Sequence, residues 1–165
     1  EPPEPGAAAV PVSEEDPGVA LARYAAALAD GVDAALATWV VGCVVSVMTA
    51  WSGGVPPDVA ESAEAAGARA VTEIGPAVRA LLEADIDDQP TTPLALVRRA
   101  VLYPTGVLRD AGVPPVERDP FDEAAFPEDD YGLAPASFAD LDPGLAEVAI
   151  RWGAAKAFEH KRRHR

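Results

Sequence analysis

The first half of the chain carries apolar residues at every third or fourth position, the spacing that buries one face of an α-helix. No stretch shows the sustained apolar and polar alternation that is typical of a β-strand. We therefore predict a first helix that begins at Pro17 and ends before Ser52-Gly53. Its buried stripe consists of Leu21, Tyr24, Leu28, Val32 and Leu36.

A pairing of a capping residue with proline recurs along the chain and predicts where helices begin. The Asp or Thr side chain can accept a hydrogen bond from a free backbone N–H of the first turn. The proline after it suits the first helical position, where its fixed φ is helical and its missing N–H is not needed. These pairs are Asp16-Pro17, Thr92-Pro93, Asp119-Pro120 and Asp142-Pro143.

The second predicted helix runs from Pro57 to about residue 87. Asp58 and Glu61 have the spacing of a capping box at its start. Because proline lacks the N–H of the helical ladder and clashes with the preceding turn, Gly75-Pro76 should kink this helix or divide it.

The third predicted helix spans residues 93–111 and should bend at Pro104, before a stop at Gly112. Short helices are predicted at residues 120–126 and 136–141. The last helix starts at Pro143.

These elements predict an all-α protein, namely a bundle of four to five helices with a long acidic irregular loop. We expect one domain over residues 16–160, within which residues 113–142 form the loop. Residues 1–15 are rich in Pro, Ala and Glu and predict a disordered tail, and residues 161–165 form a basic tail.

No charged residue occurs from Ala34 to Pro57, so this stretch needs an environment other than water. Residues 34–51 would span about 27 Å as a helix, close to the ~30 Å hydrocarbon core of a bilayer. The flanks are acidic and lack the Lys or Arg that orients a membrane span. We therefore favour a central bundle helix with one face in a homodimer over a membrane anchor at residues 34–51. The residues predicted to mediate self-association are Trp39, Val40, Val44, Val47, Met48 and Trp51.

The net charge limits the partners that the protein can bind, and the cysteine content limits the disulfides that it can form. The net charge of −14 and a pI of about 4.4 disfavour binding to nucleic acid and anionic lipid. The single cysteine, Cys43, excludes an intramolecular disulfide framework. We expect a cytoplasmic protein, with membrane association as the alternative.

The acidic loop combines aromatic side chains with many carboxylates. It lacks the spacing of an EF-hand, so a solvated loop that docks a protein partner is favoured over a Ca²⁺ site. The predicted partner surface consists of Phe121, Phe126, Asp129, Asp130 and Tyr131.

Nothing in the chain has the pattern of a catalytic or cofactor site. Both histidines, His160 and His164, lie at the extreme terminus, no serine occupies a Gly-x-Ser-x-Gly turn, and no phosphate-binding loop occurs. Arg98, Arg99 and Arg109 have the chemistry to clamp a carboxylate or phosphate, although helix surfaces often carry such residues. We predict a non-enzymatic interaction or regulatory module without cofactor or metal. A small-ligand or metal-binding enzyme is a second alternative.

The second half of the chain contains four short strings: Tyr103-Pro104-Thr105, Val107-Leu108-Arg109, Ala111 to Pro115 and Trp152 to Lys156. On these strings, residues 93–160 resemble small actinobacterial helical proteins of unknown function. It implies a cytoplasmic bacterial protein, and it assigns no activity or site residue.

Overall fold

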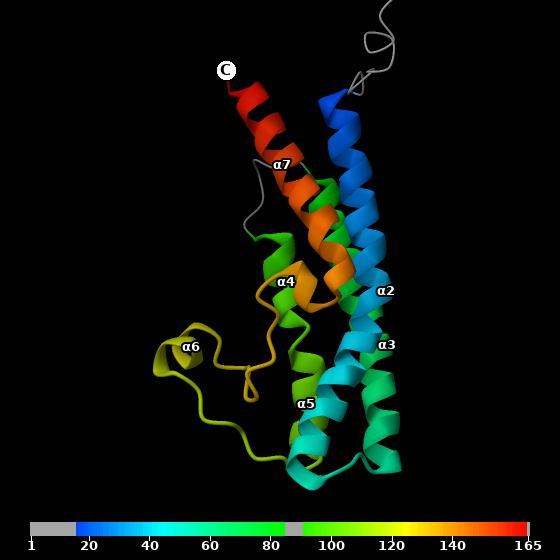
Figure 1. Cartoon of the computed structure of the whole chain (residues 1–165), viewed down its shortest axis with the longest axis vertical. Coiled ribbons are helices and arrows are strands. Elements are labelled where there is room, and N and C mark those ends of the chain that lie inside the picture. The colour runs from blue at the N-terminus through cyan, green and yellow to red at the C-terminus, as the bar shows by residue number, and fades with distance from the viewer. Residues whose placement is uncertain (1–15, 85–90, 165) are drawn as a thin grey trace, which may run out of the picture.

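A computed structural model describes residues 16–84 and 91–164 of the chain (Figure 1). All regular secondary structure in these residues is helical, so the predicted all-α fold is confirmed. The expected tail at residues 1–15 lies outside the described residues. The helices are α2 (Pro17–Ser52), α3 (Pro57–Glu83), α4 (Pro93–Arg99), α5 (Leu102–Asp110), α6 (Pro120–Ala125) and α7 (Ala146–Arg163), with 3-10 turns at Phe138–Asp140 and Pro143–Leu145.

The predicted caps are present at the starts where Asp or Thr precedes proline. The Asp16 carboxylate accepts a hydrogen bond of 2.7 Å from the Gly18 N–H, and the Thr92 hydroxyl accepts one of 3.1 Å from the Ala95 N–H. Asp119 and Asp142 cap their turns in the same way. At the other end of α2, Gly53 has φ of 83°, the left-handed conformation that stops a helix.

Of the kink or division expected at Pro76, the division is wrong, because α3 continues without a break through this residue. Pro76 and Thr72, the residue whose carbonyl loses its helical partner, are both exposed, so water can satisfy that oxygen. The predicted capping box is also wrong. Pro56 occupies the cap position without a side-chain hydrogen bond, and Asp58 lies inside the first turn.

Pro104 has a stronger effect than the predicted bend, because the third helix is divided into α4 and α5. Pro104 has no N–H to donate to the Ala100 carbonyl. The Tyr103 N–H takes that carbonyl instead at 3.1 Å, and helical bonding resumes with the Thr105 N–H and the Val101 carbonyl.

Two hydrophobic clusters lie one above the other along the antiparallel pair of α2 and α3 (Figure 1). The upper cluster joins the first half of α2 to α4, α7 and the end of α3, and it includes Leu28, Leu36 and Val78. The lower cluster joins the second half of α2 to α5 and the start of α3. Trp39 and Tyr103 pack against both clusters, so they connect the two halves of the core.

The backbones of α2 and α3 approach most closely where small residues face each other. A Cβ atom on Gly67 would lie 3.0 Å from the Ala37 carbonyl oxygen and 3.1 Å from its Cα. Further along this pair, Arg79 binds Asp30 at 2.6 Å and Asp33 at 2.8 Å. The interface between α2 and α3 is therefore set by backbone contact at one level and by an ion-pair cluster at another.

The last helix begins with a 3-10 turn at Pro143–Leu145 and continues as α7 to Arg163. Val148, Ala149 and Trp152 pack on the upper cluster, whereas Ile150 and Phe158 face solvent. The described part of the expected basic tail is thus mostly an extension of the helix.

Candidate interaction surfaces

The inner face of α2 is the core of the protein rather than a surface. Val40 and Val44 are fully buried and Met48 nearly so, and they pack against α3, α5 and Tyr131 of the loop. The prediction that these three residues meet a second copy is therefore corrected, because the same chain already covers them. Of the predicted set, Trp39 and Val47 are half-buried, and Trp51 remains 49% exposed.

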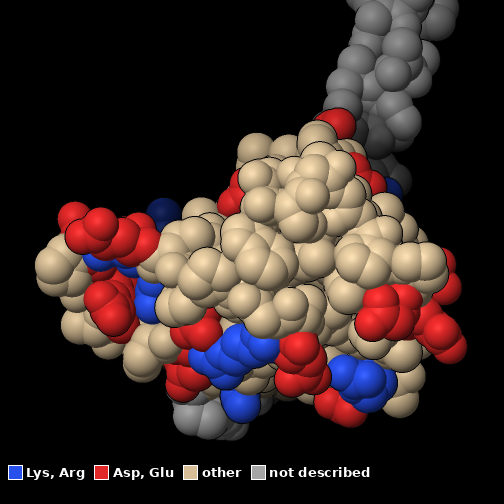
Figure 2. All heavy atoms as spheres, turned by 90° about the horizontal axis from the view of Figure 1, so that it is seen from below, with Lys and Arg blue, Asp and Glu red and all other residues tan. Residues whose placement is uncertain are grey.

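The outer face of α2 is exposed and carries no charge. We call this surface the uncharged face; it consists of Thr38, Gly42, Val45, Ser46 and Thr49. Figure 2 views the end of the bundle where α2 turns into α3, and a broad area there has no Lys, Arg, Asp or Glu. Acidic and basic side chains gather around this area. The exposed, uncharged surface of α2 is therefore formed by residues other than those that the sequence indicates.

One helix in the described residues, α2, is long and apolar enough to cross a membrane. A soluble core helix meets the same criterion. Only 33% of its most apolar 18-residue stretch is buried within the protein. Much of the apolar run therefore lacks a covering group from its own chain.

Most of the predicted partner surface in the acidic loop faces inward. Asp129 and Tyr131 are buried. The Asp129 carboxylate accepts hydrogen bonds from the N–H groups of Leu133 at 2.7 Å and Ala134 at 2.9 Å. The Tyr131 hydroxyl donates to the Val113 carbonyl at 2.8 Å. These two residues hold the loop in its fold, so their assignment to a partner surface is corrected.

Arginines from the bundle and the loop fix two more of the predicted residues. Arg109 of α5 donates to Asp130, and this hydrogen bond holds the pKa of the carboxyl below its ordinary value. The Arg98 guanidinium lies 5.6 Å from the centre of the Phe126 ring, and Arg118 donates to the Phe126 carbonyl at 2.9 Å. The predicted clamp by Arg98 and Arg109 on a ligand is thus replaced by contacts within the chain.

Phe121 is the member of the predicted partner surface that remains open to solvent. It is 80% exposed, and α6, on which it lies, has no buried residue. Figure 1 shows α6 projecting to one side of the bundle. The acidic loop is therefore a well-anchored segment that presents one aromatic side chain.

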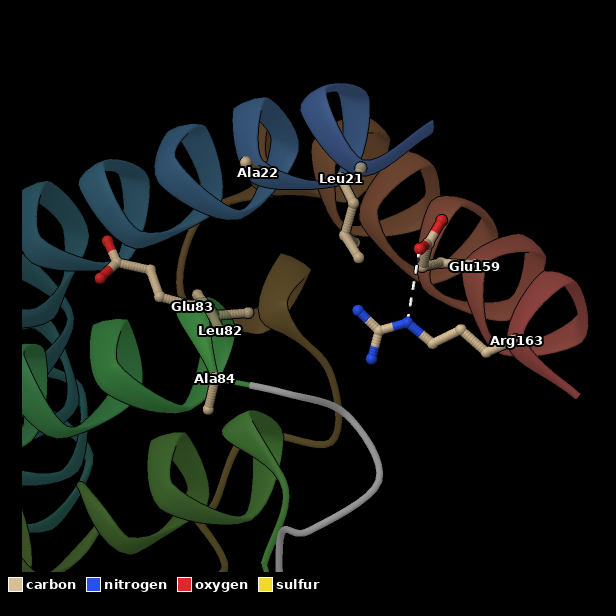
Figure 3. A pocket seen from close by; sticks show the side chains of 8 residues that line it. Leu21, Ala22, Leu82, Glu83, Ala84, Glu159 and Arg163 are labelled. Carbon is tan, nitrogen blue, oxygen red and sulfur yellow. Dashed lines mark ion pairs between the residues drawn. The ribbon is translucent and has the colours of Figure 1, made fainter. Parts of the chain in front are cut away.

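A cavity of about 500 Å³ opens where α7 diverges from the start of α2 and the end of α3 (Figure 3). Leu21 and Leu82 supply apolar walls. Arg163 lies on the α7 side, 3.5 Å from Glu159. Arg162 also donates to Glu159 and lowers the pKa of its carboxyl. Two of the charged groups that line this cavity, Glu159 and Arg163, are thus engaged with each other.

A second cavity, of about 560 Å³, lies between α3 and the α4–α5 pair. Its lining includes Arg99, which the sequence suggests as a clamp, and also Arg69, Tyr103 and Gly106, which it does not. Sequence reasoning misses the cavity because it depends on the division between α4 and α5.

Groups with metal-binding or nucleophilic chemistry are poorly placed. No cluster of three or more His, Cys, Asp or Glu in residues 16–84 and 91–164 is arranged to hold a metal ion. The ring of His164 contacts the His160 carbonyl at 2.9 Å. Burial, with a further contribution from the negative charge of Asp129, raises the pKa of the Cys43 thiol to about 12, so little of it is thiolate at neutral pH.

No family model matches the chain, and neither the curated proteins nor the solved structures that were searched contain a match.

Proposed function

We propose that this protein is a non-enzymatic interaction module that self-associates through the uncharged face of α2. The observation that carries the proposal is the absence of charge on an exposed helix face in a chain of net charge −14. Two copies repel each other wherever their acidic surfaces meet. The uncharged face is the surface on which a second copy can approach with the least repulsion, and the apolar side chain of Val45 there gains from burial.

The small residues of this face also favour a second helix as the occupant. Gly42 and Ser46 are four residues apart and exposed, so they lie side by side on the surface of α2. A Cβ atom on Gly42 would meet nothing within 4 Å. Another α2 can therefore come close to the backbone at this point, as in helix pairs built on small residues.

The membrane alternative is less favoured because of what lies beside the apolar run. The start of α3 packs along the same half of α2, and it carries Asp58, Glu61 and Glu64, all exposed. Insertion of residues 34–51 would require these carboxylates to enter hydrocarbon or α2 to leave its core contacts. Either event is costly, since charged side chains in a bilayer and exposed cores are both strongly disfavoured.

The test compares Gly42→Glu with the matched control Gly153→Glu. Both glycines lie in helices, both are exposed, and a Cβ at either meets nothing within 4 Å. Both variants should therefore fold with unchanged helical circular dichroism. Sedimentation velocity should find a dimer for the wild type and for Gly153→Glu, and a monomer for Gly42→Glu.

Two results would overturn the proposal. A wild-type protein that remains monomeric at the highest concentration tested has no self-association to explain. A wild-type protein that floats with neutral lipid vesicles, and is released by detergent alone, would establish the membrane alternative instead.

A further inference from the structure

The cavity beside α3 has the form of a small-molecule site. Its volume of about 560 Å³ lies within the range of ligand pockets. Ile74, Leu96 and Leu102 provide an apolar floor from three different helices. The helix is interrupted between α4 and α5, and Leu102 at the start of α5 is 41% exposed.

Two arginines on the edge of this cavity have no carboxylate partner. Arg69 of α3 and Arg99 of α4 both line the cavity, and neither makes an ion pair with another described residue. Other arginines of the chain are engaged by it: Arg79 and Arg109 bind carboxylates, and Arg98 contacts Phe126. Two guanidinium groups that line one cavity favour an anionic ligand.

Tyr103 and Glu73 limit the charge that this anion can carry. The Tyr103 hydroxyl donates to the Glu73 carboxylate within the lining of the cavity. Burial first, and then the contact with Glu73, raise the pKa of Tyr103 to about 12, while the charges of Arg69 and Arg99 act in the opposite direction. Tyr103 therefore stays neutral, and Glu73 leaves a negative charge that opposes a dianion such as phosphate.

We infer that this cavity binds an organic monocarboxylate with an apolar body. The carboxylate lies between Arg69 and Arg99, and the apolar body covers Ile74 and Leu102. Arg69 and Arg99 carry two positive charges and Glu73 carries one negative charge. The single negative charge of the ligand therefore makes the site neutral. The site shares no residue with the uncharged face, so loss of self-association and loss of ligand binding are separate events.

The test is a titration of ¹⁵N-labelled protein with octanoate, followed by ¹H–¹⁵N NMR. Octanoate should shift the amide signals of α3, α4 and α5 residues around the cavity. Octanamide, which lacks the charge, and inorganic phosphate, which lacks the apolar body, should each bind more weakly by about tenfold or more.

The variants separate the charged and apolar parts of the site. Arg69→Gln and Arg99→Gln should each weaken octanoate binding about tenfold. Arg98→Gln is the matched control, because Arg98 lies next in the chain but contacts Phe126. Gly106→Leu should narrow the cavity and weaken octanoate binding without disturbing the fold, since a Cβ at Gly106 meets nothing within 4 Å.

Gly153→Leu controls for the addition of a leucine elsewhere on a helix. The inference is overturned if octanoate causes no shifts around the cavity, or if octanamide binds as well as octanoate. Wild-type affinity in Gly106→Leu would overturn it as well, because the added leucine side chain takes space in the cavity that the apolar body would occupy.

Discussion

The close approach of α2 and α3 makes Gly67→Ala a sharp test of how the bundle is packed. A methyl group at this position would meet the Ala37 backbone, with its carbonyl oxygen at 3.0 Å and its Cα at 3.1 Å. Ordinary contacts between such atoms are about 3.5 Å or longer. A backbone cannot turn away as a flexible side chain can, so α2 and α3 must separate locally.

Two opposing contributions set the size of the effect. Replacing glycine by alanine inside a helix stabilises by about 1 kcal/mol through helix propensity. Overpacking a tight contact costs about 1–3 kcal/mol. Because the α2–α3 contact is the most extensive between helices in the described chain, we expect the cost to exceed the gain. The free energy of unfolding should fall by up to about 2 kcal/mol.

Urea denaturation followed by circular dichroism at 222 nm measures this change. Gly153→Ala is the matched control, because Gly153 is also helical but a Cβ there meets nothing within 4 Å. It should stabilise the protein by about 0.5–1 kcal/mol. If Gly67→Ala stabilises the protein as much as Gly153→Ala does, the two helices are not in backbone contact.

Further predictions concern the lower half of the molecule. Val44→Asp places an unpaired charge at a fully buried position, so it should unfold the protein and not only separate a dimer. The expected loss of stability, on the order of 4 kcal/mol, is measured by thermal melting. Cys43, with its pKa raised to about 12, should react with Ellman's reagent at pH 8 far more slowly in the native protein than in urea, and equal rates would refute its burial. The pKa of Asp130 is lower in the folded state than its ordinary 3.8, so the Arg109 pairing stabilises the protein above that pH and is lost as pH falls through the folded value. Asp130→Asn should therefore reduce the loss of stability in acid, and an unchanged acid titration would contradict the pairing.

Local sequence signals predict the helices well, because caps and apolar spacing act within a few residues. Asp16-Pro17 and Thr92-Pro93 mark the observed starts of α2 and α4. The effects of internal prolines depend on tertiary surroundings. Pro76 is tolerated because it lies on an exposed face, whereas Pro104 is buried and accompanies the division between α4 and α5.

The surfaces are harder to predict than the helices, since the sequence does not state which face of an apolar helix its own chain will cover. Val44 and Val45 are neighbouring residues of the same type, yet Val44 lies in the core and Val45 is 42% exposed. Asp129 illustrates the same difficulty in the loop. Its carboxylate is used by backbone N–H groups nearby, and no composition argument reveals this. Arg69 and Arg99 are likewise far apart in the sequence, and only the fold places both on the lining of one cavity.

Because α2 belongs to both hydrophobic clusters, α7 can separate from the bundle without opening the lower half. This helix of 36 residues is shared by the upper and lower halves, whereas α7 packs on the upper one and contributes nothing to the lower. Separation of α7 would therefore leave the α2–α3–α5 contacts in place. Amide protons near Leu36 and Val40, where the shared helix crosses between the halves, should exchange with solvent only on complete unfolding, and those of α7 much sooner.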